Sequence, residues 1–248
     1  FTQKFEEYAI TSSDWAEYLI SIMKAYADTS PQKNDCLKAW VERSTISEVY
    51  ALDIINKFPN AKFIQVVRDP RDNYASMKSR WNKKLKYLSD SSSLESLRQS
   101  FIDRGRLSLE TGIINKMIYD KQYMICRYED LVADTKNTLS TIADFLGINN
   151  DLFDYNTTFC GLQWKGNNFD GKRFDGVSSS QIGSWKKRID DDEAALIEFH
   201  FRHVMGYYNY KIEMQEELQM KAASKHYKWF NFSSDRKADF KLANKAKF

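Results

Sequence analysis

A cationic residue follows an apolar run near the first quarter of the chain, in a position suited to holding a phosphate group. Residues 63–67 (FIQVV) are almost all apolar, and Arg68 comes directly after them. In parallel α/β sheets, ligands bind beyond the carboxyl ends of the strands. A guanidinium can clamp a phosphate there with two parallel hydrogen bonds. The chemistry that this turn predicts is recognition of a phosphorylated ligand.

The helix expected after this turn would add donors to the same site. Asp69 can cap it, Pro70 suits the first helical position, and Asp72 could complete a capping box with Asp69. The first helical turn exposes backbone N–H groups that carry a partial positive charge. Ser76 lies within the first two turns and could donate its hydroxyl, so we predict that Arg68 and Ser76 grip one phosphate. The alternative is that these charged residues only cap the helix.

Strands and helices alternate along the chain. Apolar runs predict strands at 37–41, 63–67 and 122–127, and helical spacing predicts helices at 13–28, 47–58, 70–81, 94–119, 135–146, 190–206 and 211–223. The run at 63–67 is typical of an internal strand covered on both faces. Residues 161–184 contain five glycines and few apolar anchors, which predicts a long loop of the functional kind. The alternation predicts an α/β fold, with a parallel central sheet flanked by helices and a helical C-terminal extension.

Composition limits the classes of partner and compartment. The 248 residues are 42% apolar and 15% aromatic, enough for one domain with a sizeable core. The 37 basic and 34 acidic residues are too evenly balanced to indicate a nucleic-acid partner. Three widely spaced cysteines indicate neither a disulfide framework nor a metal site. No apolar run reaches the roughly 18 residues of a membrane span. We therefore expect a soluble protein, in the cytoplasm by preference, or in the secretory-pathway lumen if a preceding segment carries an anchor.

The segment FIQVVRDPRDNYASMKSRW (63–81) resembles the 3′-phosphate-binding motif of sulfotransferases that use 3′-phosphoadenosine 5′-phosphosulfate (PAPS). In that motif, a strand ending in Arg-Asp-Pro-Arg-Asp leads to a serine in the next helix. Further segments resemble the same family in the same order, namely WVERSTISEVYALDIINKFPNAKFIQVVRDPR, ICRYEDLVADTKNTLSTIADFLGI and GNNFDGKRFDGVSSSQIGSWKKRI. The resemblance implies a P-loop-NTPase-like sulfotransferase fold, with residues 1–210 as the sulfotransferase domain and 211–248 as a helical, basic extension.

The resemblance also implies a donor and the residues that bind it. PAPS would be the sulfuryl donor and adenosine 3′,5′-bisphosphate (PAP) the product, with Arg68 and Ser76 on the 3′-phosphate. Tyr128 would lie near the adenine, although a purely structural tyrosine is an open alternative. A lid over the nucleotide would include Ser178, Ser179, Ser180, Gly183 and Trp185, with charge from Lys186, Lys187 or Arg188. A solvated basic helix start would explain those charges equally well.

The catalytic groups are less clearly marked. Arg43 stands where the family commonly has the lysine of Lys-Thr-Pro, and Ser44-Thr45 replace Thr-Pro, which leaves its role open. Transfer at sulfur needs a base for the acceptor and cations for the leaving oxygen, but no metal. Glu42 is the nearest carboxylate and is our hypothesis for the base, with a plain surface residue as the alternative. His200 and His203 lie one helical turn apart without further ligands at metal-binding spacing, so they predict no metal site.

One part of the family pattern is missing from these residues. No Gly-rich Ser-Gly-Thr-Thr turn, which binds the 5′-phosphosulfate in the family, occurs in the chain. We expect an N-terminally incomplete domain whose loop is supplied by a preceding segment or a second chain. These residues alone should then bind PAP weakly and transfer sulfate poorly. The acceptor could be a carbohydrate, lipid, peptide or small molecule. A non-catalytic nucleotide-binding or scaffolding module of the same fold is the alternative, whereas a kinase would need a Walker-type loop that is absent.

Overall fold

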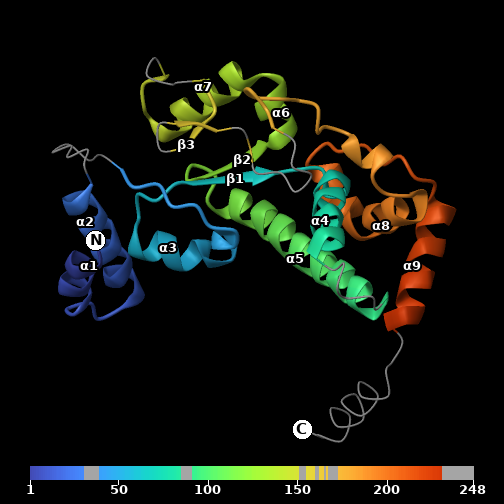
Figure 1. The fold of residues 1–248 in the computed structure, drawn as a ribbon, viewed down its shortest axis with the longest axis horizontal. Coiled ribbons are helices and arrows are strands. Elements are labelled where there is room, and N and C mark those ends of the chain that lie inside the picture. The colour runs from blue at the N-terminus through green and yellow to red at the C-terminus, as the bar shows by residue number, and fades with distance from the viewer. Residues whose placement is uncertain are drawn as a thin grey trace, which may run out of the picture. The chain divides into compact units, whose positions relative to one another are not determined.

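The computed structural model describes residues 1–30, 39–84, 91–150, 155–159, 162–164, 166 and 173–230. These residues form two compact units, which comprise residues 1–61 and 62–248. Figure 1 labels their helices and strands.

The first unit is helical. It contains α1 (Thr2–Ala9), α2 (Trp15–Thr29), the short 3-10 helix η1 (Ser47–Tyr50) and α3 (Ala51–Lys57). Asp14 caps α2, because its side chain accepts hydrogen bonds from the backbone N–H groups of Ala16 and Glu17. Residues 39–46 form neither helix nor strand, so the described part of the strand predicted at 37–41 does not form. Positions 37 and 38 lie outside the described residues.

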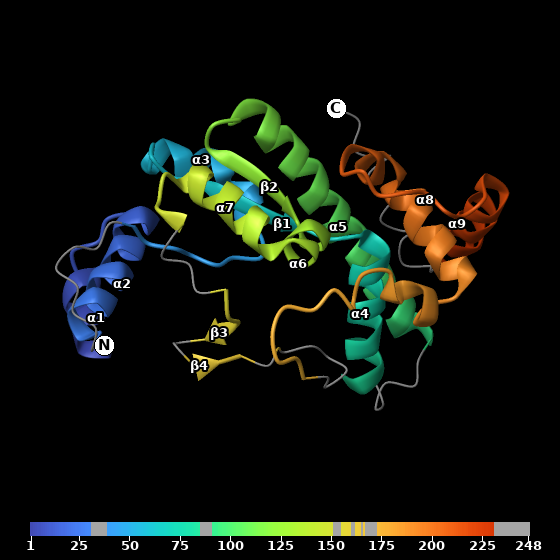
Figure 2. The ribbon, with the colours of Figure 1, turned by 90° about the horizontal axis from the view of Figure 1, so that it is seen from above.

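The second unit is built around a parallel strand pair. β1 (Phe63–Val67) pairs in parallel with β2 (Tyr123–Arg127), and the register runs from Phe63 opposite Tyr123 to Val67 opposite Arg127. Between the two strands the chain passes through α4 (Pro70–Lys84) and α5 (Ser91–Ile118), which confirms the predicted α/β class. The pair lies between α5 and the helices α6 (Tyr128–Ala133) and α7 (Thr135–Leu146), as Figures 1 and 2 show.

The central sheet is smaller than the sequence suggested. Among the described residues β1 has β2 as its only neighbour, and Val66 is 56% exposed. The prediction that this strand is covered on both faces is therefore wrong at Val66, because no described element covers the sheet there. The P-loop-NTPase-like arrangement stays a prediction, since a two-stranded sheet does not establish it.

Helix α5 approaches β1 closely at a glycine. A Cβ atom at Gly112 would lie 2.0 Å from Oε1 of Gln65. The Gln65 side chain donates to the backbone oxygen of Ser108 (3.1 Å) and accepts from the Tyr123 hydroxyl (2.9 Å). The missing side chain leaves room for these bonds. They hold β1 against α5 three residues before Arg68.

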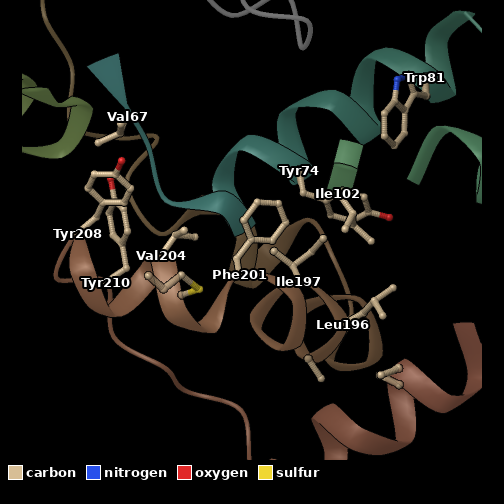
Figure 3. Packing of buried hydrophobic residues seen from close by; sticks show 14 residues of the cluster. Val67, Tyr74, Trp81, Ile102, Leu196, Ile197, Phe201, Val204, Tyr208 and Tyr210 are labelled. Atoms are coloured by element: carbon tan, nitrogen blue, oxygen red, sulfur yellow. The ribbon is translucent and has the colours of Figure 1, made fainter. Parts of the chain in front are cut away.

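The core lies where α8 (Asp191–Tyr207) packs against α4, α5 and α9 (Glu216–Phe230). Figure 3 shows Tyr74 from α4 and Phe201 from α8 in this cluster, and neither side chain has any exposed surface. The ring of Phe101 lies 5.4 Å from that of Tyr74 and 5.9 Å from that of Phe201, measured between centroids. Burial of these aromatic side chains fixes the position of α4 and hence of its first turn.

The remaining elements match the sequence in part. Helix α7 covers the helix predicted at 135–146 and ends at Gly147, whose φ of 72° is the left-handed conformation that glycine adopts readily. Tyr128 begins α6 instead of extending β2. Of the loop predicted at 161–184, the described residues form a two-residue strand, β4 (Leu162–Gln163), paired with β3 (Thr158–Phe159), and the start of the 3-10 helix η4 (Ser184–Lys187). None of the described helices is long and apolar enough to span a membrane.

Candidate functional site

Arg68 and Tyr128 meet at the carboxyl ends of the two parallel strands. Because β1 and β2 end in the same register, the residues that follow them leave the sheet side by side. The guanidinium carbon of Arg68 lies 4.6 Å from the centroid of the Tyr128 ring. The Arg68 Nη2 atom donates to the backbone oxygen of Gln181 at 2.9 Å. The Nε atom of Arg68 is buried without a hydrogen-bond partner in the described part of the chain. The guanidinium is thus held in place while keeping donor capacity for a ligand.

The other charged side chains of the Arg-Asp-Pro-Arg-Asp turn are turned inward. Asp69, Arg71 and Asp72 are only 7%, 3% and 0% exposed. The two carboxylate oxygens of Asp69 accept from Nε (3.0 Å) and Nη2 (2.7 Å) of Arg71, and Nη1 of Arg71 donates to Glu198. Burial acts to lower the pKa of Arg71, but its bonds to these two carboxylates outweigh burial and raise the pKa. The Asp69 carboxylate also caps α4 by accepting from the backbone N–H of Arg71 at 2.9 Å, as predicted, whereas Arg68 contacts Gln181 and Tyr128 instead.

The predicted capping box between Asp69 and Asp72 is wrong. The backbone N–H of Asp69 donates to Glu129 at 3.0 Å, not to Asp72. The carboxylate of Asp72 instead accepts from the backbone N–H of Gly183 (2.7 Å), the backbone N–H of Trp185 (2.8 Å) and the hydroxyl of Ser184 (3.1 Å). Burial raises the pKa of the Asp72 carboxyl, against the lowering effect of the two N–H bonds and of the Arg68 charge. Asp72 therefore joins α4 to a segment more than a hundred residues away.

We refer to residues 178–188 as the lid segment, and it runs along the face of α4 that carries Ser76. Ser76 follows Asp72 by four residues, so both lie on one side of the helix. Ser79, one turn later, accepts from Nη2 of Arg188 at 2.8 Å. The hydroxyl of Ser76, which is partly exposed, thus lies between two positions that contact the lid segment.

The predicted lid residues have different surroundings. The Ser178 and Ser180 hydroxyls are 2.9 Å apart, and Ser179 is exposed. Gly183 has a φ of 66°, a conformation that suits glycine. Trp185 is 4% exposed, with its ring centroid 4.4 Å from the guanidinium carbon of Arg71, so its side chain supports the site from inside. The Lys186 ammonium pairs with Glu213 at 2.6 Å, away from the bonds of Arg188 to α4.

The comparison with known proteins identifies the family. A family model described as the sulfotransferase family matches residues 2–152. The chain belongs to the sulfotransferase family. The match confirms the family predicted from the sequence, and it includes β1, α4 and β2 with Arg68, Ser76 and Tyr128.

The chain is also similar to carbohydrate sulfotransferase 1 of Rattus norvegicus. It is 27% identical over 173 residues, which make up 64% of the chain and 41% of the relative. The chain thus spans less than half the length of that curated relative. No solved structure matches the chain.

The predicted catalytic residues lie in the first unit of the chain. Glu42 and Arg43 are exposed in the irregular stretch 39–46 of the first unit, and their participation stays a prediction. In the described residues, no group of three or more histidine, cysteine or acidic side chains could hold a metal ion. His203 pairs with Glu110 at 2.8 Å, and His200 is buried with its ring centroid 6.0 Å from that of His226.

Sequence reasoning missed three partners of the site. Glu129 orients the start of α4, the Gln181 backbone oxygen holds Arg68, and Asp72 fastens the lid segment. Each of these contacts joins residues at least 60 positions apart in the chain. No local pattern signals such contacts. The nearest signal was the second aspartate of the motif, which the capping-box interpretation assigned to a local bond.

Proposed function

We propose that this sulfotransferase binds the 3′-phosphate of PAPS with Arg68 and Ser76 and transfers the sulfuryl group to an acceptor hydroxyl or amine. The observation that carries the proposal is the state of Arg68. Among the described ion pairs, Arg71 is paired twice with carboxylates, whereas Arg68 is paired with none. The Nε atom of this guanidinium has no hydrogen-bond partner among the described residues. Such a group is suited to a phosphate, because charge-assisted bidentate hydrogen bonds are stronger than those between neutral groups.

The geometry supports binding by side chains more than by the helix start itself. The backbone N–H of Arg71 already donates to the Asp69 side chain (2.9 Å), and that of Asn73 donates to the Asp69 backbone oxygen (3.0 Å). These first-turn amides have partners, so the contacts left for the phosphate are the Arg68 guanidinium and the Ser76 hydroxyl. The partial positive charge of the helix start adds to both.

The aromatic ring beside Arg68 supports a nucleotide ligand. Tyr128 is partly exposed, and one edge of the site is formed by its ring and the guanidinium stacked on it. An aromatic side chain next to a phosphate clamp is suited to stacking on adenine. Tyr128 would thus contact the base while Arg68 holds the 3′-phosphate of the same nucleotide.

Transfer requires a base and a leaving group on PAPS. The acceptor oxygen or nitrogen forms a bond to sulfur and loses its proton to the base, while the bond from sulfur to the bridging phosphate oxygen breaks and PAP leaves. We propose Glu42 as the base, because it is the carboxylate nearest to the segment that resembles the family's Lys-Thr-Pro turn, and Arg43, which stands in place of the lysine of that turn, as a further nucleotide-binding residue. The name of the rat relative supports a carbohydrate hydroxyl as the acceptor.

Titration of PAP against the wild-type chain and Arg68→Ala tests the site. Loss of a charge-assisted contact of about 2–3 kcal/mol should weaken PAP binding about 30- to 150-fold. Arg104→Ala, which removes an exposed arginine on α5, is the matched control and should leave the affinity unchanged. Adenosine 5′-monophosphate, which lacks the 3′-phosphate, should not distinguish Arg68→Ala from the wild type. Equal PAP affinity of Arg68→Ala and wild type would refute the assignment.

A further inference from the structure

A single buried carboxylate fastens the lid segment to α4. Asp72 has no exposed surface, and its bonds come from the three consecutive residues Gly183, Ser184 and Trp185. Asp72 forms no ion pair among the described residues, so hydrogen-bond donors take the place of water around its charge. Burying an ionised carboxylate in this way is favourable only with such donors.

The shape of the lid segment matches this carboxylate. Gly183 has a φ of 66°, and the helix η4 begins immediately after it. Successive N–H groups in a turn of this kind form a concave site for an anion. Here the N–H groups of Gly183 and Trp185 converge on the two different oxygens of Asp72. This concave site is occupied by the Asp72 side chain, so it connects the lid segment to α4. We call this connection the structural joint.

The same segment also reaches Arg68. The backbone oxygen of Gln181 accepts from Arg68 two residues before the turn that binds Asp72. The lid segment is thus attached at the end of β1 and on the first turn of α4. Ser76 lies one turn further along α4 than Asp72, on the same side of the helix.

We propose that Asp72 is a positioning residue for nucleotide binding, an inference that rests on the proposed function. It fixes residues 178–185 over Arg68 and Ser76 without contacting the ligand. The three donors stabilise the Asp72 carboxylate by hydrogen bonds, so Asp72 is held without an ion pair to the Arg68 guanidinium.

Asp72→Asn tests this inference with almost no change in shape. Asparagine keeps one carbonyl oxygen, so it can accept from Gly183 or from Trp185 but not from both, and its NH₂ group would face the other N–H. We expect hydrogen exchange of the amides of residues 178–188 in the ligand-free protein to become faster by about tenfold, the effect of losing one bond of about 1.4 kcal/mol. PAP binding should weaken by about the same factor.

Glu193→Gln is the matched control, because Glu193 is also a buried carboxylate next to α4 but contacts Tyr74 and Lys78 instead of the lid segment. It should lower the melting temperature without changing lid exchange or PAP affinity. If Asp72→Asn does not fold, Ser184→Ala, which removes one bond to Asp72, should show the same two effects at about two- to fivefold.

Two results would overturn the inference while leaving the proposed function intact. Unchanged exchange of residues 178–188 in Asp72→Asn would show that Asp72 does not hold the segment. Faster exchange with unchanged PAP affinity would show that the joint does not serve the nucleotide. Failure of the wild-type chain to bind PAP would instead end the proposed function, and the nucleotide role of Asp72 with it.

Discussion

Two groups of charged side chains lie beside α4, one around Lys78 and one just before its first turn, and they differ in how their charges are neutralised. Further along the helix, Glu193 accepts from the Tyr74 hydroxyl (2.9 Å), the Lys78 ammonium (2.5 Å) and Nη2 of Arg98 (3.4 Å). At the start of the helix, Arg68 contacts a backbone oxygen and an aromatic ring, both of them neutral. Burial of charge alone therefore does not mark a functional residue. The charge that lacks an opposite partner does.

The largest expected effect on stability is at Glu193, whose carboxylate contacts Lys78 and Arg98. Glu193→Ala should lower the free energy of unfolding by about 3–5 kcal/mol, because it leaves the Lys78 ammonium without the carboxylate that it pairs with and removes one of the two carboxylates beside Arg98. It also removes the capping box that Glu193 forms with Asp190 at the start of α8. Urea unfolding of the variant and of the wild type would measure the difference. A loss below about 1 kcal/mol would mean that the ion pairs of Glu193 contribute little to stability, so they would not differ in this respect from the unpaired Arg68.

Acid should also destabilise the protein, through the buried imidazole of His200 on α8, which is uncharged at neutral pH. Burial, and to a lesser extent the neighbouring His226, lower the pKa of His200 to about 4. The unfolded chain, in which a histidine has a pKa near 6.5, binds the extra proton between these values, so stability falls as pH drops through this range. Between pH 7 and pH 5 this group should remove about 2 kcal/mol of stability.

Chemical unfolding of wild type and His200→Gln at the two pH values isolates this contribution, because the other titrating groups are common to both chains. The wild type should lose about 2 kcal/mol more than the variant on acidification. Equal losses would place the pKa of His200 near its ordinary value.

The smallest expected effect on stability is at Arg68. Arg68→Ala should change the free energy of unfolding by less than about 1 kcal/mol, since that guanidinium forms no ion pair among the described residues. Thermal unfolding, followed beside Arg104→Ala, would show this. A loss as large as that of Glu193→Ala would make Arg68 a structural residue and remove the distinction between the two groups.

Local signals in the sequence were enough for most of the fold. Caps such as Asp14, Pro70 and Gly147 act on their own helix, so the starts and ends of α2, α4 and α7 could be predicted from neighbouring residues. Arg68 and Tyr128 could be placed together because both follow strands of a parallel sheet. This part of the site depends only on element order.

What the sequence could not provide were contacts between distant segments. The covering of a strand depends on which elements pack on it, so the exposure of Val66 could not be read from an apolar run. The bonds of Asp72 to Gly183 and Trp185 depend on the tertiary fold, and a local rule assigned that carboxylate to its own helix instead. A strand was predicted at 37–41, but its described residues are irregular. An apolar run forms a strand only where a neighbouring strand is there to pair with it, and the run itself does not show that.

The glycine at position 112 has a consequence for how this sequence can diverge. Any larger residue there would displace the amide of Gln65 from Ser108 and Tyr123, and so remove side-chain bonds that hold β1 against α5. A shorter residue at position 65 would make room for alanine at position 112. The two positions therefore constrain each other, and a substitution that looks conservative in the middle of a helix would be felt in the neighbouring strand.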